Sequence, residues 1–198
     1  YVVCAERFES SYLENLGKGK FRIKPLPIEA QFSPTFGTAT VDYNKDGNLD
    51  VLLVGNSYST EVISGKYDAS IGLYLQGDGK GNFKPLKSKD SGFSADGDSK
   101  GMAKFIAGDG NELIIVSNNS DRVRVYSPKD KGKYYRAKKD DAYALVKLSN
   151  GKVRKHEFYY GSTYLSQSSR ALKLDARIVS LEVFDSSGNE VSIELNSN

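Results

Sequence analysis

Short apolar runs separated by glycine-rich turns follow one another along most of the chain. The longest runs are VLLVG at residues 51–55 and LIIVS at residues 113–117. Each has the length of a buried strand, well short of the roughly 18–20 apolar residues that a membrane-spanning helix needs. No stretch shows the spacing of apolar residues that is typical of an amphipathic helix. The pattern therefore predicts an all-β protein without a transmembrane segment.

Two segments share a pattern of strand, glycine-rich turn and strand. They read SYLENLGKGKFRIKPL from Ser11 and LYLQGDGKGNFKPL from Leu73, and Tyr12 corresponds to Tyr74 at an offset of 62 residues. The other matching pairs are Leu13 and Leu75, Gly17 and Gly79, Gly19 and Gly81, and Phe21 and Phe83. Glycine supplies the positive φ angles that tight turns require, so both segments are predicted to be β-hairpins.

A second pair of segments repeats at a similar distance. DGNLDVLLVGN begins at Asp46 and DGNELIIVSNN begins at Asp109, an offset of 63 residues. Each is predicted to be a turn that leads into a buried strand. A period near 60 residues with about four short strands per unit indicates β-propeller blades. We expect about two blades, as part of a larger propeller; a two-sheet sandwich is the alternative.

The pattern changes from about Asp140. One predicted hairpin turns at Asn150-Gly151, a strong hairpin signal, and another turns at Ser187-Gly188-Asn189. These strands predict a small β-rich C-terminal domain rather than a third repeat. The sequence thus predicts blades over residues 1–127, a charged linker over residues 128–140 and a β domain over residues 141–198.

The amino-acid composition agrees with a β-rich protein and says little about its cellular location. The chain contains 13 Tyr and 19 Gly but one Cys, so no disulfide can form within it. Cys4 follows Tyr-Val-Val, a poor match to a lipid-attachment site, and we expect a buried thiol in a strand. Because the chain does not begin with Met, we expect it to be the C-terminal part of a longer protein.

The loop ahead of the first long apolar run is the strongest chemical signal. The sequence DYNKDGNLD places Asp42, Asn44 and Asp46 at positions 1, 3 and 5, Asn48 at position 7 and Asp50 at position 9. Carboxylates this close repel one another unless something positive neutralises them. Asp and Asn side chains, with the backbone carbonyl of Asn48, form the all-oxygen set that Ca²⁺ prefers. We predict a calcium site, with a metal-free loop of Asx turns as the alternative.

Two comparisons sharpen this prediction. The loop is not an EF-hand, because Leu53 occupies position 12, where an EF-hand has Glu, and a strand follows instead of a helix. In the second copy, Phe105 and Ala107 replace Asp42 and Asn44, so no metal is expected there. The metal is thus predicted to be a structural element of one blade.

Other candidate sites are weaker. His156 is the only histidine and has no nearby nucleophile in the sequence, so catalysis is not expected there. Asp96 and Asp98 could form a second cation site, but a solvated loop is favoured. Residues 121–160 contain 12 Lys and Arg against 5 Asp and Glu, with interleaved aromatic residues. Such a segment could bind nucleic acid or an anionic glycan; a solvated sheet edge is the simpler interpretation.

Residues 1–127 resemble the FG-GAP/VCBS repeat family of β-propellers, on the strength of YLENLGKGKF, LYLQGDGKGNF and DYNKDGNLD. The tail is similar to ASPIC/UnbV domains through GSTYLSQSS and VSLEVFDSSG, although Phe184-Asp185 stands where that family has Trp-Pro. The resemblance implies the same calcium ligands and an extracellular or cell-surface location, outer membrane-associated if the source is bacterial.

Together these features predict a non-catalytic, calcium-stabilised interaction module that binds a protein or a glycan at the cell surface. The first alternative is nucleic-acid or anionic-glycan binding through residues 121–160, which would weaken steeply as salt rises. The second is an accessory region of a larger enzyme or surface complex.

Overall fold

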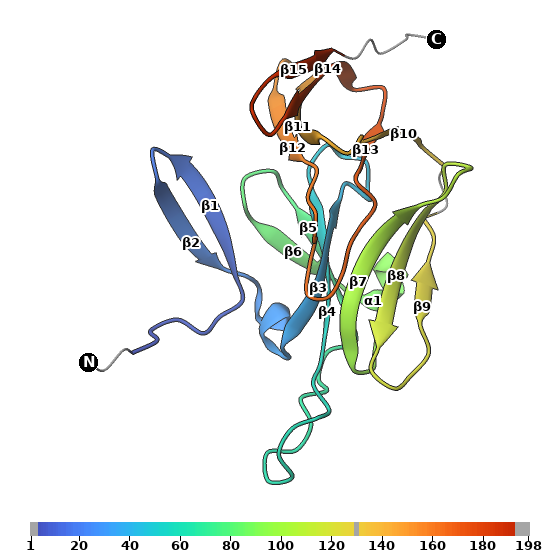
Figure 1. Ribbon diagram of the computed structural model, residues 1–198. Helices are drawn as coiled ribbons and strands as arrows, with labels where there is room; N and C mark the ends of the chain where they lie inside the picture. The colour runs from blue at the N-terminus through green and yellow to red at the C-terminus, as the bar shows by residue number, and fades with distance from the viewer. Residues whose placement is uncertain (1–3, 129–130, 193–198) are drawn as a thin grey trace. The chain divides into compact units, whose positions relative to one another are not determined.

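The computed structural model describes residues 4–128 and 131–192, which fold mostly into antiparallel β-sheets with very little helix (Figure 1). The prediction of a β-rich chain is confirmed at this level. The described residues do not form a closed propeller.

The N-terminal half of the chain contains six strands and two short helical turns. They are β1 (Ser11–Gly17), β2 (Lys20–Pro25), the 3-10 turn η1 (Ile28–Gln31), β3 (Thr35–Val41), β4 (Asp50–Gly55), β5 (Leu73–Gly77), β6 (Phe83–Leu86) and α1 (Ser88–Ser91). The second half contains nine strands. They are β7 (Ser99–Ile106), β8 (Glu112–Asn118), β9 (Arg124–Tyr126), β10 (Lys133–Arg136), β11 (Asp141–Leu148), β12 (Val153–Glu157), β13 (Ala171–Leu174), β14 (Ile178–Asp185) and β15 (Glu190–Ser192).

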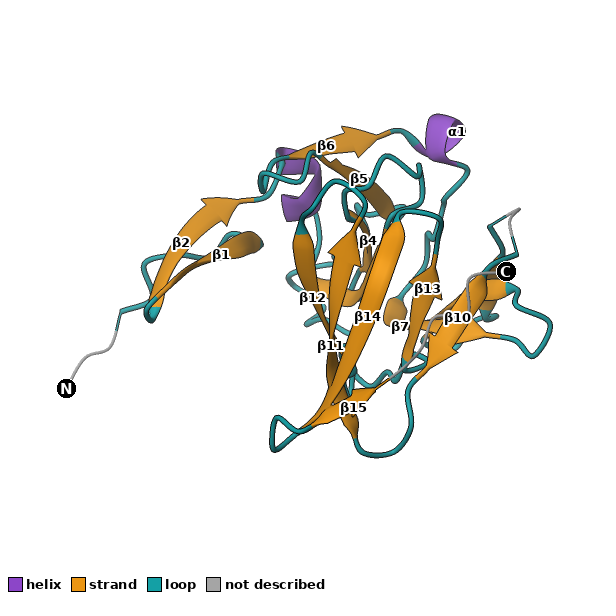
Figure 2. Ribbon diagram, turned by 90° about the horizontal axis from the view of Figure 1, so that it is seen from above, coloured by secondary structure: helices purple, strands orange, loops and turns teal. Residues whose placement is uncertain are grey.

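These strands form sheets of two to four strands each. One four-stranded sheet has the order β3-β4-β5-β6, and β7-β8-β9 form a three-stranded sheet. The second four-stranded sheet has the order β12-β11-β14-β15, which is seen from above in Figure 2. The pairs β1-β2 and β10-β13 form two-stranded sheets.

The chain divides into two compact units. Unit 1 comprises Tyr1–Ala103, Ile115–Tyr126 and Thr163–Ser166, and unit 2 comprises Lys104–Ile114, Ser127–Ser162 and Gln167–Asn198. The domain boundaries predicted from the sequence stay a prediction. Within the segment predicted as a linker, the structure forms β10, which pairs with β13.

The sheet β3-β4-β5-β6 in unit 1 positions the predicted calcium loop. Its apolar cluster is centred on Ala30, Leu53 and Leu75, and Val51 and Phe83 pack against it. Val51 and Leu53 lie at alternate positions of β4, and Leu73 and Leu75 at alternate positions of β5, so the four side chains share one face of the sheet. The loop 42–49 therefore leaves β3 and enters β4 at the edge of a packed core.

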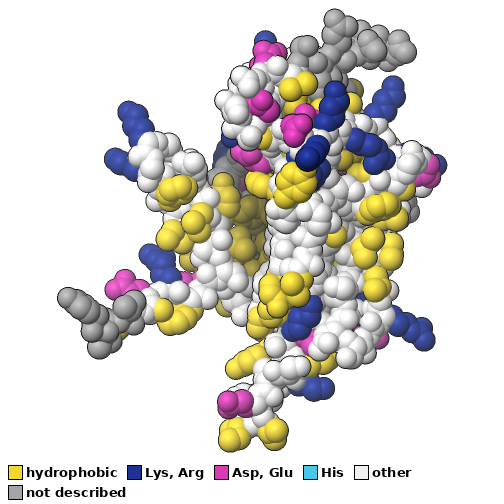
Figure 3. Space-filling model, in the orientation of Figure 1, with side chains coloured by type: hydrophobic (Ala, Val, Ile, Leu, Met, Phe, Trp, Pro, Cys, Tyr) yellow, Lys and Arg dark blue, Asp and Glu magenta, His cyan; other side chains and the backbone are white. Residues whose placement is uncertain are grey.

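The two matching hairpins have the same strands but different surroundings. Leu75 in β5 is completely buried, whereas its counterpart Leu13 in β1 is 58% exposed. Phe21 in β2 is similarly exposed, while its counterpart Phe83 is partly buried. Figure 3 shows hydrophobic side chains at the surface over the β1-β2 hairpin. The difference arises because β5 pairs with β4, whereas β1 pairs with β2 alone.

In unit 2, both predicted hairpins are confirmed. β11 and β12 pair antiparallel around Gly151, and β14 and β15 pair around Gly188. The core of this sheet contains Ala144, Val146 and Val183, all completely buried.

Two further observations concern expectations about the ends and the membrane. Cys4 is exposed and lies outside any strand, so the expectation of a buried strand thiol is wrong. Across residues 4–128 and 131–192, no helix is long and apolar enough to cross a bilayer.

Candidate functional site

The predicted calcium loop connects β3 to β4 and is organised by its own side chains. The backbone N–H of Gly47 donates to Oδ2 of Asp42 at 3.0 Å, and that of Asp46 donates to Oδ1 of Asn44 at 3.1 Å. The N–H of Asn48 donates to Oδ1 of Asp46 at 2.8 Å. The N–H of Asn48, and next the side-chain amide of Asn44, hold the pKa of Asp46 below its usual range. The loop is therefore a series of Asx turns that keeps the Asp46 carboxylate ionised.

Asp50, the fifth predicted ligand, is directed into the interior and is completely buried. Its Oδ2 accepts hydrogen bonds from the hydroxyl of Tyr74 at 2.5 Å and from the N–H of Tyr43 at 3.1 Å, and its Oδ1 accepts one from the N–H of Gly77 at 3.0 Å. Burial, and next the hydrogen bond to Asp50, raise the pKa of Tyr74. Asp50 thus joins the start of the loop to the end of β5.

Four of the five predicted ligands lie in the loop 42–49, and Asp50 is the first residue of β4. Among the described residues, no group of three His, Cys, Asp or Glu side chains is arranged to hold a metal ion. Nδ2 of Asn44 instead donates to Oδ2 of Asp46 at 2.8 Å. The chemistry of the donor set still fits calcium, because every side chain offers oxygen and Oδ1 of Asp50, with one hydrogen bond, keeps a free lone pair. If calcium were bound, Oδ2 of Asp46 would contact the cation in place of the side-chain amide of Asn44.

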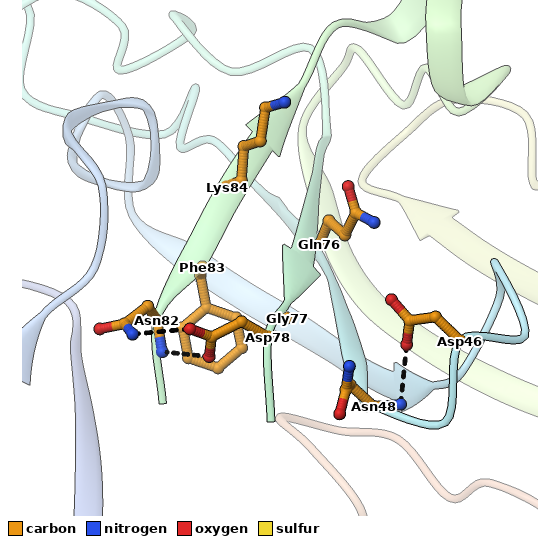
Figure 4. Close-up of a pocket in the computed structure, with 8 residues that line it drawn as sticks. All are labelled: Asp46, Asn48, Gln76, Gly77, Asp78, Asn82, Phe83 and Lys84. Atoms are coloured by element: carbon orange, nitrogen blue, oxygen red, sulfur yellow. Dashed lines mark hydrogen bonds between the residues drawn. The ribbon is translucent and has the colours of Figure 1, made fainter. Parts of the chain in front are cut away.

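A cleft of about 450 Å³ lies beside this loop and opens to solvent (Figure 4). Its lining comes from the loop, from the end of β5 and from the turn into β6. The lining residues are Asp46, Asn48, Gln76, Gly77, Asp78, Asn82, Phe83 and Lys84. The residues of the β5-β6 hairpin gave only a turn signal in the sequence; apart from Asp46 and Asn48, none of the lining residues was predicted to belong to a site.

The turn that forms one wall of the cleft is fixed by Asp78. Its Oδ1 accepts from the N–H groups of Lys80 at 2.7 Å and Asn82 at 3.1 Å, and its Oδ2 accepts from Nδ2 of Asn82 at 2.7 Å. The Asn82 side chain, followed by these backbone N–H groups, lowers the pKa of Asp78 to about 2. Gly79 approaches the loop so closely that a Cβ there would lie 2.3 Å from Oδ1 of Asn48, and its φ of +70° also favours glycine.

The buried pairing of Asp50 with a tyrosine occurs at two other strands, both in unit 2. Glu112, the first residue of β8, accepts from the hydroxyl of Tyr134 at 3.0 Å. Asp141, the first residue of β11, accepts from the hydroxyl of Tyr135 at 2.5 Å. Burial is the largest cause of the raised pKa of both tyrosines. The only sign of these buried acids in the sequence is that each one directly precedes a run rich in apolar residues.

The second possible cation site, at residues 94–101, is occupied by basic side chains of the protein. Oδ1 of Asp98 lies 2.6 Å from Nζ of Lys100, and Oδ1 of Asp96 lies 2.5 Å from a guanidinium nitrogen of Arg124. Asp98 is buried, so the expectation of a solvated loop is wrong for this residue.

Several basic and aromatic side chains of residues 121–160 form hydrogen bonds or ion pairs with other residues of the chain. The guanidinium of Arg136 donates to the carbonyls of Ile106 and Ala107, and the hydroxyls of Tyr134 and Tyr135 are bound as described above. Arg124 pairs with Asp96. Tyr159 and Tyr160 in the same segment are exposed, and binding through residues 121–160 stays a prediction.

His156 is half-buried on β12 and packs edge-to-face against Phe158 with ring centroids 5.1 Å apart. Burial, and then the charges of Lys104 and Arg154, lower its pKa to about 4. At neutral pH the imidazole is therefore uncharged.

No protein-family model matches the sequence, and a search of curated proteins also found no match. The resemblance to FG-GAP/VCBS repeats and to ASPIC/UnbV domains therefore stays a prediction.

Proposed function

We propose that this chain is a non-catalytic interaction module of the extracellular space or cell surface, stabilised by calcium at residues 42–50, that binds a protein or a glycan. The observation that carries this proposal is the arrangement of the loop. Asp50 fixes it to β5 from within, the carboxylate of Asp42 accepts from the N–H of Gly47 inside the loop, and Asn44 and Asp46 are exposed. A rigid scaffold that carries a polar loop beside an open cleft is suited to recognition.

Calcium is the cation that this loop suits best. Its ligands would be the side chains of Asp42, Asn44, Asp46 and Asp50 and the backbone carbonyl of Asn48. Bound calcium would neutralise the carboxylates and stabilise the folded state. Extracellular calcium, near the millimolar range, suffices for sites with dissociation constants of about 0.1–1 mM.

For the fold, we propose that the β1-β2 hairpin is the outer half of a propeller blade whose inner strands come from another segment of polypeptide. The internal repeat supports this. In the matching hairpin, β4 pairs with β5 through Leu52 and Tyr74, and the core covers Leu75. At the 62-residue offset, the corresponding partner strand would pair with β1 opposite Tyr12 and cover Leu13.

Calcium is expected to raise the thermal stability of the protein through this loop. At about ten times its dissociation constant, calcium would add about 1.4 kcal/mol, or roughly 3–6 °C in Tm. Asp46→Ala removes one ligand and should abolish this calcium-dependent shift. Calorimetry in calcium and in chelator measures both effects.

Asp109→Ala is the matched control for this experiment. Asp109 occupies the corresponding turn, where its carboxylate accepts from Asn111 and lies 3.5 Å from Nζ of Lys131. This variant should keep the full calcium response. An identical Tm in calcium and chelator for the unmodified protein would refute the proposed stabilising metal.

The proposed blade predicts unequal costs for equivalent leucines. Leu75→Ala removes a completely buried side chain and should cost about 2–5 kcal/mol of unfolding free energy, whereas Leu13→Ala should cost less than about 0.5 kcal/mol in this chain. Urea denaturation measures both values. If Leu13→Ala cost as much as Leu75→Ala in this chain, the proposed incomplete blade would be wrong.

A further inference from the structure

The cleft beside the calcium loop combines the groups that bind sugar hydroxyls. We infer that it binds a neutral saccharide, which would be the partner in the interaction role proposed above and so rests on that proposal. The lining provides two carboxylates, three side-chain amides and one aromatic ring. A sugar hydroxyl both donates and accepts hydrogen bonds, so it can satisfy a carboxylate and an amide at the same time.

The carboxylates of the cleft are held by hydrogen bonds before any ligand arrives. Asp78 accepts three hydrogen bonds within its own turn, and Asp46 accepts one from the N–H of Asn48 at 2.8 Å. Two fixed acceptors lose little rotamer freedom when they bind a hydroxyl pair. With Lys84 as the one cation of the lining, the cleft carries net negative charge, which disfavours sialylated or sulfated sugars.

The amides and the ring are also held in place. One N–H of Asn82 is bonded to Asp78, and an amide has a second N–H and a carbonyl for a ligand. The Phe83 ring packs edge-to-face on Tyr12 with centroids 5.5 Å apart. Figure 4 shows Asp78 and Asn82 beside this ring on one side of the cleft, and Asp46 and Asn48 on the other. A polar ligand with one apolar face matches this arrangement.

The matching hairpin shows that this chemistry is not a general requirement of the turn. At the 62-residue offset, Leu16 and Lys20 stand in place of Asp78 and Asn82, although the strands and the glycines are the same. The β1-β2 turn therefore forms without a carboxylate or an amide at these positions. The polar lining at β5-β6 is therefore a property of this turn and not of the shared hairpin pattern.

The test is a titration of the ¹⁵N-labelled full chain with methyl glycosides of glucose, galactose and N-acetylglucosamine, followed by NMR. At least one glycoside should shift the side-chain amide signals of Asn48, Gln76 and Asn82 saturably, with a Kd of about 1 mM, as expected for a small solvent-open site. Gln76→Leu should weaken this binding about tenfold. Asn111→Ala, in the comparable turn of unit 2, should bind like the unmodified protein.

Two small charged compounds test whether the cleft binds sugars selectively. Methylammonium chloride and sodium acetate should leave these amide signals unshifted; shifts as large as those from the glycosides would overturn the saccharide assignment. The absence of saturable shifts with all three glycosides would also overturn it. Because the calcium-dependent Tm is measured separately, failure of the saccharide titration alone leaves the calcium proposal standing.

Discussion

Replacing Asp50 with alanine should lower the unfolding free energy by about 3–5 kcal/mol, the largest loss expected from any single loop residue. The reason is that three donors lose their acceptor in a buried place. The hydroxyl of Tyr74 and the N–H groups of Tyr43 and Gly77 would each lose the hydrogen bond to Asp50. The loop would also lose its connection to β5. Urea denaturation with chelator present measures this loss without any contribution from calcium.

Two variants separate the buried role of Asp50 from its role as a metal ligand. Asp46→Ala removes an exposed acid from the same loop and should cost less than about 1 kcal/mol in chelator. Tyr74→Phe removes one of the three donors and should cost about 1–2 kcal/mol. If Asp50→Ala cost no more than Asp46→Ala under these conditions, the three hydrogen bonds would not have the stabilising role assigned to them.

Acidification should destabilise the protein through His156, by about 2 kcal/mol at pH 5 and about 3 kcal/mol at pH 4. The folded pKa of about 4 lies below the unfolded value of 6.5, so the unfolded chain binds more protons between these values. Stability therefore falls as pH decreases through this window, and the effect is absent above it. Protonation is unfavourable because the imidazole is half-buried and lies close to Lys104 and Arg154; Glu157 partly offsets this.

His156→Gln isolates this contribution, because glutamine has similar size and does not titrate. The variant should lose less stability between pH 7 and pH 5 than the unmodified protein, and the difference between the two should approach the values above. Parallel stability curves for the two proteins across this range would contradict the buried neutral histidine. Lowered carboxylate pKa values, such as that of Asp175, act mainly at lower pH and affect both proteins alike.

The strands were predictable because their signals are local. Period-two alternation, the Asn150-Gly151 turn and the matching glycines of the two hairpins each determine a few neighbouring residues, and the structure confirms these elements. The pairing of β10 with β13 joins segments almost 40 residues apart in sequence, and no local pattern specifies it. The exposure of Leu13 could not be predicted for the same reason. The local pattern shows which side chains share a face of a strand, but not which other strands cover that face.

The candidate site was predictable only in part. The spacing of Asp42, Asn44 and Asp46 predicted a calcium site, with a loop of Asx turns as the alternative; the structure forms Asx turns, and the calcium site stays a prediction. The spacing could not show that Asp50 faces inward to Tyr74. That contact depends on the register between β4 and β5, which brings residues 24 positions apart together. The cleft was missed because its walls belong to two different turns.

The three buried acid–tyrosine hydrogen bonds give this protein a particular vulnerability in strong base. Each phenol is held protonated beyond the point where a free tyrosine would ionise, so the folded chain retains protons that the unfolded chain gives up. Once such a phenol does ionise, two anions face each other with little water between them. High pH would therefore break the hydrogen bonds at the first residues of β4, β8 and β11 and destabilise both units of the chain.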